Sequence, residues 1–321
     1  MTKKIAIIGA GKMAQAHLDV LVGMDDVEVV GVYSRTLNNA ELLAKQYDIN
    51  VVATSVSHLY EKTEADGVVI AVSENATAVV CQTAFQYPWK LLIEKPLGIN
   101  LIECKKIINE AFSSKAEAFV ALNRRNYGSV SDAYALLNEI NDETRIITIK
   151  DQEAPILARE AGRDELVISN WHFANSIHLI DLFTVFARGD VSRIRNIIPW
   201  KGNGTMLTHS VIEFTSGDIG IYHSLWDAPG PWAVEIETKT LRLAMQPLEA
   251  LSVQKFPSRH CEVARGHKND NKFKPGFYIQ MSKFLDSIDE KKTSLCTLDE
   301  YLSTATLVNS LYRDREYALG D

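Results

Sequence analysis

Short apolar runs rich in β-branched residues alternate with helical patterns through the first third of the chain. Runs that are apolar at nearly every position are typical of parallel strands covered on both faces. The expected strands are 5–8, 27–32, 51–52, 68–72, 91–93 and 119–121. The expected helices are 13–21, 38–46, 76–85 and 101–111. This alternation predicts an α/β fold with a doubly wound parallel sheet.

The pattern changes after Leu122. Long strands in which apolar and polar residues alternate are expected at 205–214, 219–226 and 234–245. Such strands are typical of an antiparallel sheet with one covered face. A further strand is expected at 145–150, helices at 130–140, 175–186, 277–287 and 298–311, and a solvated loop at 265–272. We therefore expect two domains, residues 1–122 and 123–321.

The composition indicates which kinds of partner and which cellular compartment to expect. The 34 basic and 41 acidic side chains give a net charge of -7, which argues against a nucleic-acid partner. Apolar runs all fall short of the ~18–20 residues that cross a membrane. The basic start leads into a strand and a glycine turn, so it does not resemble a signal peptide. The widely spaced cysteines favour free thiols in a reducing cytoplasm; they are Cys81, Cys104, Cys261 and Cys296.

A glycine-rich turn follows the first predicted strand. Its sequence at residues 9–14, GAGKMA, has the G-x-G-x-x-A form of a dinucleotide-binding fingerprint. Gly9 permits the tight turn, Gly11 lets the backbone approach a pyrophosphate, and Ala14 allows close helix packing. The alternating strands and helices supply the context that this pattern needs. The sequence thus predicts a bound dinucleotide on a Rossmann domain, with contacts from Gly9, Gly11, Lys12 and Met13.

The end of the second strand carries the signal for cofactor choice. An acidic residue there binds the ribose hydroxyl of NAD, but this chain has Ser34, Arg35 and Thr36. A guanidinium group can pair with a 2′-phosphate or stack on the adenine. We expect NADP(H) to be preferred, with NAD(H) as the alternative. Further cofactor contacts are expected from Ala71, Val72 and Asn75.

The fifth strand runs into Glu94, Lys95 and Pro96. Ligands of doubly wound sheets lie outside the carboxyl ends of the strands, so Lys95 is directed at the cleft. Glu94 would then contact the nicotinamide ribose or orient the lysine. Taken alone, the triplet is equally consistent with a surface turn.

These motifs, followed by Asn123-Arg124-Arg125, have the order and spacing of the glucose–fructose oxidoreductase / inositol dehydrogenase / rhizopine-catabolism (Gfo/Idh/MocA) family, which the chain resembles over essentially its full length. The resemblance implies a second α/β domain with an open, mostly antiparallel sheet. It also implies hydride exchange between a nicotinamide and a hydroxyl carbon of a sugar, cyclitol or related compound. Lys95 matches the catalytic lysine of the family.

The second domain departs from the family in one position. The family has an Asp-x-x-x-His-x-x-Asp-like helix, which His178 and Asp181 match, but the earlier acid falls on Ala174. A histidine that titrates near neutral pH can exchange the alcohol proton. We therefore expect His178 to be catalytic; a histidine packed in the core is the alternative.

Helical spacing places Trp171, Asn175 and His178 on one face. With His172 and Asp181 they form the expected substrate-binding surface. His172 and His178 are six positions apart, which is not the i, i+4 pair of a zinc helix, so no metal site is expected.

Two more candidate substrate-binding residues follow the sixth predicted strand. Arg125 can bind substrate hydroxyls, a phosphate or a carboxylate, although a salt bridge at the domain junction is an equal alternative. Tyr127 is also expected to bind substrate. For Trp226 and Trp232, core packing or a subunit contact is preferred over sugar stacking.

The leading hypothesis is a cytoplasmic NAD(P)-dependent oxidoreductase that acts on a small sugar-like substrate, including nucleotide-linked or amino sugars. A non-catalytic dinucleotide sensor is the alternative, motivated by Ala174, and reduction of a non-sugar carbonyl or imine is a third reading. A sheet face with no predicted helix over it predicts a homodimer or homotetramer. The residues placed on that face are His209, Val211, Glu213, Tyr222 and His223.

Overall fold

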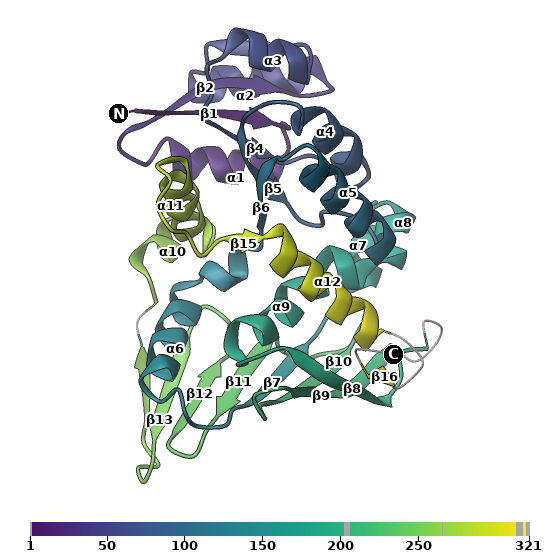
Figure 1. Ribbon diagram of the computed structural model, residues 1–321, viewed down its shortest axis with the longest axis vertical. Helices are drawn as coiled ribbons and strands as arrows, with labels where there is room; N and C mark the ends of the chain where they lie inside the picture. Colours follow the sequence, from purple (N-terminus) through teal and green to yellow (C-terminus); the bar gives the residue numbers. More distant parts are fainter. Residues whose placement is uncertain (1, 202–205, 265, 313–316, 319–321) are drawn as a thin grey trace. The chain divides into compact units, whose positions relative to one another are not determined.

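The computed structural model describes residues 2–201, 206–264, 266–312 and 317–318 (Figure 1). The chain divides into two compact units. The first comprises Met1–Leu122 and Asn271–Leu302, and the second comprises Asn123–Asp270 and Ser303–Asp321. The division at Leu122 coincides with the expected boundary, whereas residues 271–302 group with the first unit and not with the second.

The first unit is built on a seven-stranded sheet in the order β15-β6-β5-β4-β1-β2-β3. Strands β1 to β6 are parallel to one another, and β15 pairs antiparallel with β6. The strands are β1 Lys3–Ile8, β2 Val27–Tyr33, β3 Val51–Ala53, β4 Gly67–Ile70, β5 Lys90–Glu94, β6 Glu117–Ala121 and β15 Cys296–Thr297. The predicted parallel Rossmann-type sheet is therefore confirmed.

Helices connect these strands, as the apolar periodicity indicates. They are α1 Lys12–Leu21, α2 Leu37–Tyr47, α3 Val56–Lys62, η1 Glu74–Ala76, α4 Thr77–Ala84 and α5 Leu101–Ser113. The sequence did not predict α3 or η1, since both are short. The signal for α3 is local: the hydroxyl of Ser55 accepts a hydrogen bond from the amide of His58, which caps the helix start.

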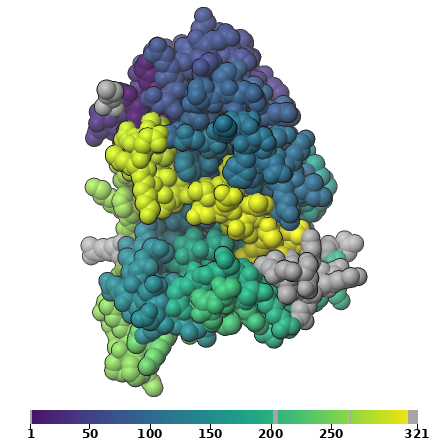
Figure 2. Space-filling view, in the orientation of Figure 1, coloured from purple at the N-terminus to yellow at the C-terminus, as the bar shows by residue number. Residues whose placement is uncertain are grey.

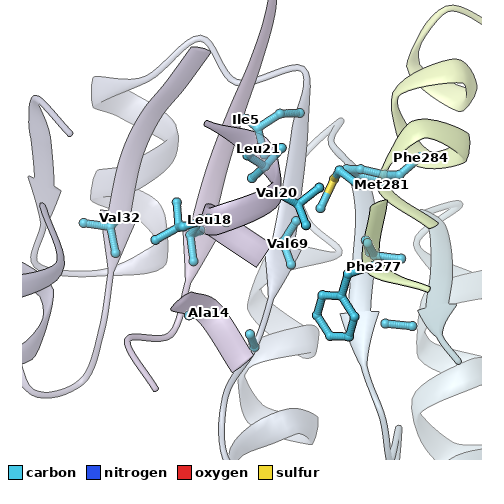
Figure 3. Close-up of a cluster of buried hydrophobic side chains, with 14 of the residues drawn as sticks. Ile5, Ala14, Leu18, Val20, Leu21, Val32, Val69, Phe277, Met281 and Phe284 are labelled. Carbon is cyan, nitrogen blue, oxygen red and sulfur yellow. The ribbon is translucent and has the colours of Figure 1, made fainter. Parts of the chain in front are cut away.

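One helix from late in the chain completes the core of the first unit. In α11, Phe277–Ile288, the side chains of Phe277, Met281 and Phe284 pack with Leu18 and Leu21 of α1 (Figure 3). The space-filling view shows late residues, in yellow, against the blue surface of early ones (Figure 2). Burial of these aromatic rings explains why residues 271–302 belong to the first unit.

The second unit contains a nine-stranded sheet in the order β14-β13-β12-β11-β7-β10-β9-β8-β16. Strands β7 and β10 are parallel, and the other neighbouring pairs are antiparallel. The bounds are β7 Ile146–Asp151, β8 Val191–Ile198, β9 Leu207–Phe214, β10 Ile219–Leu225, β11 Ala233–Glu237, β12 Leu241–Met245, β13 Leu251–Lys255, β14 Cys261–Ala264 and β16 Tyr317–Ala318. The expected mostly antiparallel sheet is confirmed.

Details of this sheet differ from the prediction. The single strand expected at 234–245 is a hairpin, β11 and β12, in which the hydroxyl of Thr238 accepts a hydrogen bond from the amide of Leu241. Strands β8, β13 and β14 were missed because polar residues interrupt them. Residues 205 and 265, each part of a predicted segment, lie outside the described residues, and the expected loop contains α10, Lys268–Lys272.

The helices of the second unit are η2 Asn123–Asn126, α6 Gly128–Glu139, α7 Pro155–Glu160, α8 Glu165–Ser169, the π-helical turn η3 His172–Ser176 and α9 Ile177–Phe186. Helix α12, Leu298–Leu311, begins in the first unit and ends in the second. Most side chains of α9 are buried, and Phe183 lies against Tyr222 of β10 with ring centroids 6.4 Å apart. This helix covers one face of the sheet at its centre.

Candidate active site

The fingerprint turn has the geometry of a phosphate cradle. Gly9 has φ +119°, and a Cβ atom there would lie 2.0 Å from the carbonyl oxygen of Ala71. A side chain at Gly11 would meet nothing within 4 Å, so the backbone is open at this point. Gly11 is the N-cap residue of α1, and it has no side chain that could accept a hydrogen bond from the helix amides. The first amides of α1 thus remain available to an anion, which fits the pyrophosphate of a dinucleotide.

The neighbouring strand ends frame this turn. The amide of Gly9 donates to the carbonyl of Tyr33, and the amide of Ala71 donates to that of Ile8, both at 2.7 Å. Val72 is half-buried and Asn75 is exposed on η1. Within the turn, Lys12 is exposed, and the sulfur of Met13 lies 3.4 Å from Nζ of Lys274.

The end of β2 presents polar side chains to solvent. Ser34 is half-buried, while Arg35 and Thr36 are exposed. Thr36 precedes α2 and makes no side-chain hydrogen bond to it. A guanidinium group and free helix amides therefore lie at the same strand end, an arrangement suited to a phosphate.

Glu94 has a partner that the sequence did not identify. Its carboxylate lies 2.8 Å from Nε2 of His17, a fully buried side chain of α1. The His17 ring in turn packs on Phe277, with ring centroids 4.7 Å apart. Glu94 thus connects β5 to α1. Lys95, the next residue, is half-buried, and the peptide bond between Lys95 and Pro96 is cis.

In the second unit, Arg125 and Asp181 bind each other. Two nitrogens of the Arg125 guanidinium donate to the two carboxylate oxygens of Asp181 at 2.9 and 2.7 Å. Thr304 donates a third hydrogen bond at 2.9 Å. Because Asp181 is fully buried, this bidentate pair joins η2 to α9 and leaves the carboxylate little capacity for a ligand.

His178 and Asn175 do not lie on one regular helix face as the spacing predicted. Asn175 lies in the π turn η3, whereas His178 lies on α9, which starts at Ile177. His178 is buried. His172 stacks on Tyr312 with ring centroids 4.7 Å apart, and burial lowers the pKa of His172 to about 4. The imidazole of His172 is therefore neutral at pH 7 and takes part in an aromatic cluster.

Trp171 and Asn175 meet at a residue that the sequence analysis missed. Both donate to Oε2 of Glu153, at 2.8 and 2.7 Å. Glu153 follows β7, whose last residue, Asp151, accepts a 2.5 Å hydrogen bond from the hydroxyl of Tyr222. The available signal was two acidic residues at the carboxyl end of a strand.

Asp151 and Glu153, hereafter the carboxyl pair, have strongly perturbed acidity. Burial, followed by the charge of Asp151, raises the pKa of Glu153 to about 9. Burial also raises the pKa of Asp151, against the opposing hydrogen bonds of Ser176 and Tyr222. Perturbed carboxyl groups of this kind are frequent at functional sites.

Arg124, and not Arg125, is the arginine of η2 that faces a hollow. Its guanidinium lies 4.1 Å from the ring centroid of Trp232, and both line a hollow of about 270 Å³ with Tyr127. Trp226 instead packs on Trp200, with ring centroids 4.6 Å apart. The preferred packing role of Trp226 agrees with this placement, whereas Trp232 lies at a surface hollow.

Two kinds of feature are absent from the described residues. Within those ranges, three or more His, Cys, Asp or Glu side chains are nowhere grouped so that they could hold a metal ion. Across the same part of the chain, no helix has the length and apolar character to span a membrane.

Comparison with known proteins shows what residues 3–122 are similar to. The model of the oxidoreductase family with an NAD-binding Rossmann fold, GFO_IDH_MocA, matches residues 3–122. Glucose-6-phosphate 3-dehydrogenase of Bacillus subtilis is 29% identical over 46% of this chain and 41% of its own length. Myo-inositol 2-dehydrogenase of Thermotoga maritima is 22% identical over 68% of this chain and 67% of its own length.

Solved structures match the fold along both units. An oxidoreductase from Agrobacterium radiobacter, in complex with NAD+, L-tartaric acid and magnesium, has a TM-score of 0.77 at 14% identity and covers 99% of this chain and 98% of its own. UDP-N-acetylglucosamine 3-dehydrogenase from Acidithiobacillus ferrooxidans has a TM-score of 0.76 at 16% identity, with 96% of each chain covered. At these identities the likeness establishes a shared fold.

Proposed function

Because this chain belongs, through residues 3–122, to the NAD-binding oxidoreductases of the Gfo/Idh/MocA family, we propose that it is a dehydrogenase that oxidises a secondary hydroxyl group of a sugar or sugar derivative. The observation that carries this proposal is the open cradle formed by Gly9, Gly11 and the start of α1. The nicotinamide dinucleotide, when bound, supplies the acceptor for the hydride.

Side chains of the protein accept the proton that leaves the hydroxyl group and stabilise the resulting alkoxide. Lys95, at the end of β5, carries the ammonium group that stabilises the developing alkoxide. His178, on α9, takes the proton as general base. We assign the cofactor-facing role to the turn and strand ends of the first unit. Substrate binding falls to the second unit, where Arg124, at the hollow beside Trp232, takes precedence over the paired Arg125.

NADP(H) is the proposed preferred cofactor. Arg35 and Thr36 are exposed at the end of β2, and residues 33–36 include no carboxylate that would repel a 2′-phosphate. A nucleotide-linked sugar belongs to the proposed substrate range, in view of the UDP-N-acetylglucosamine dehydrogenase that shares this fold.

A second candidate is a dinucleotide sensor without catalysis. Its support is Ala174, which stands where the family has an acidic residue and is buried in η3. This candidate requires cofactor binding in the absence of any turnover.

One screen separates the two candidates. The purified chain is mixed with NADP+ or NAD+ and with myo-inositol, glucose 6-phosphate or UDP-N-acetylglucosamine, and absorbance of the reduced nicotinamide is recorded. The dehydrogenase proposal expects turnover with at least one of these compounds or with a related hexose derivative. Tight cofactor binding without turnover on the whole panel would favour the sensor.

A further inference from the structure

The backbone just before His178 contains an unusual turn. Residues His172–Ser176 form a π turn, and α9 begins at the next residue. A π turn has i→i+5 hydrogen bonds and holds one more residue than an α-helical turn, and such turns are frequent at functional sites. The extra residue changes the direction in which the following side chains leave the helix. The placement of His178 therefore depends on this turn.

The carboxyl pair holds the turn from the end of β7. Glu153 accepts hydrogen bonds from Asn175, within the turn, and from Trp171, immediately before it. Ser176, the last residue of the turn, acts on Asp151 in the direction that lowers the pKa of this carboxyl group. Glu153 thus holds the residue before the turn and a residue near its end.

The remaining oxygens of the pair point to a shared proton. Oε1 of Glu153 and Oδ1 of Asp151 are buried and have no hydrogen-bond partner in the described part of the chain. The two residues are 4% and 0% exposed, so both oxygens are shielded from bulk water. Two buried like charges in contact are strongly unfavourable, whereas one proton turns one carboxyl into a donor for the other.

The surrounding charges fit a pair that carries a single negative charge. Arg124 of η2 is the cation that acts on both carboxyl groups. Tyr222 of β10 donates to Asp151, and its oxygen lies 2.8 Å from that of Tyr312, which follows α12. His172 of η3 is neutral at pH 7. Arg124 also faces Glu249, so a fully ionised pair would leave negative charge without compensation.

We propose that Asp151 and Glu153 are positioning residues for His178, and that by sharing one proton they hold the π turn at residues 172–176 in the form that the reaction requires. This inference rests on the proposed role of His178. Neither carboxyl group is assigned contact with the substrate.

The proposal predicts a change at alkaline pH. When the shared proton is lost, the two carboxylates repel each other, and the hydrogen bonds from Trp171 and Asn175 to Glu153 are altered. The indole N–H of Trp171 donates to Glu153. The NMR signals of Trp171 and of His178 should therefore change together as the shared proton is lost.

The test follows the full-length chain by NMR, with ¹⁵N-labelled tryptophan and histidine, from pH 6 to 10. The Trp171 indole signal is assigned by its loss in Trp171→Phe. Glu153→Gln retains the shape and places an amide donor toward Asp151, so it imitates the protonated pair. Glu153→Ala removes the attachment altogether. Glu262→Gln removes an exposed carboxylate of β14 in the same unit and is the matched control.

In the unmodified chain and in Glu262→Gln, the signals of Trp171 and His178 should shift together with a midpoint near pH 9. In Glu153→Gln that transition should be absent, and in Glu153→Ala the His178 signals should differ from those of the unmodified chain at every pH. The proposal is overturned if the Trp171 signal stays constant from pH 7 to 10, or if Glu153→Ala leaves the His178 signals unchanged.

Kinetics separate this inference from the proposed function. If the unmodified chain turns over a sugar, its kcat should fall at alkaline pH as the shared proton is lost. This fall should be absent in Glu153→Gln, and its persistence in that variant would contradict the positioning role. If no compound is turned over, the dehydrogenase proposal fails, while the NMR result still decides whether the carboxyl pair controls the turn.

Discussion

Glu94 and Asp181 are buried carboxylates, and each is held by a basic side chain from another element. His17 of α1 holds Glu94, and Arg125 of η2 holds Asp181. Such pairs fix the elements that carry the neighbouring functional side chains, Lys95 after Glu94 and His178 one turn before Asp181. Loss of one partner would leave a buried charge uncompensated. The residue types can be read from the sequence, but the pairing cannot, because the partners are up to 77 positions apart.

Arg35 decides cofactor choice in our account. Replacing Arg35 with Ala should weaken NADP(H) binding by about tenfold or more, since a charge-assisted hydrogen bond to a phosphate contributes ~1.5–3 kcal/mol. Binding of NAD(H), which lacks the 2′-phosphate, should change little. Both dissociation constants are measurable by titration of cofactor fluorescence, and an unaltered ratio of the two would refute the assignment.

Glu153 makes stability depend on pH. Because its pKa is raised in the folded chain, only the unfolded chain releases this proton between about pH 4.3 and pH 9. The free energy of unfolding therefore falls as pH rises through this window, by up to ~1.4 kcal/mol per unit, and levels off above it. Glu153→Gln should show a shallower fall in urea denaturation and higher stability at pH 8. Equal slopes for both proteins would count against a protonated Glu153.

At the scale of elements, the strands of the parallel sheet were predictable because both faces are buried and their sequences are continuously apolar. The edge strands β13 and β14 were not, since Ser252, Gln254 and Glu262 break the apolar pattern. Helical spacing found α9 but not the π turn, because a turn with an extra residue depends on side chains from β7. The cradle was predictable from local sequence, whereas the carboxyl pair required the fold.

Helix α11 is an element whose packing can be tested directly. Phe284 is fully buried, whereas Phe112 on α5 of the same unit is exposed. Phe284→Ala should lower the free energy of unfolding by about 3–5 kcal/mol because it leaves a cavity in the core. Phe112→Ala is the control and should change it by less than ~1 kcal/mol. Equal effects in chemical denaturation would show that α11 does not complete this core.

At the scale of the whole molecule, one face of the sheet in the second unit remains partly accessible. Burial alternates along β9 and β10, so His209, Val211 and His223 lie on this face, whereas Tyr222, which the sequence analysis placed there, is on the buried face. The prediction for Tyr222 was wrong because adjacent residues of a strand, here Tyr222 and His223, point to opposite faces of the sheet.

The accessible face is our proposed interface of a homodimer or homotetramer. Light scattering should give the mass of two or four chains, and Ile221→Glu, which places a charge on this face, should reduce the mass to that of one chain. A single-chain mass for the unmodified protein would rule out the interface.

The assignment of Lys95 and His178 to one reaction is the central claim, and parallel kinetics of Lys95→Ala and His178→Ala test it most directly. Turnover of the best sugar in the screen is followed by reduced-nicotinamide absorbance, and cofactor affinity is measured on the same preparations. We expect each variant to bind NADP+ and to lose about 10²–10⁴-fold in kcat. Variants that fold, bind NADP+ and retain full turnover would contradict the account.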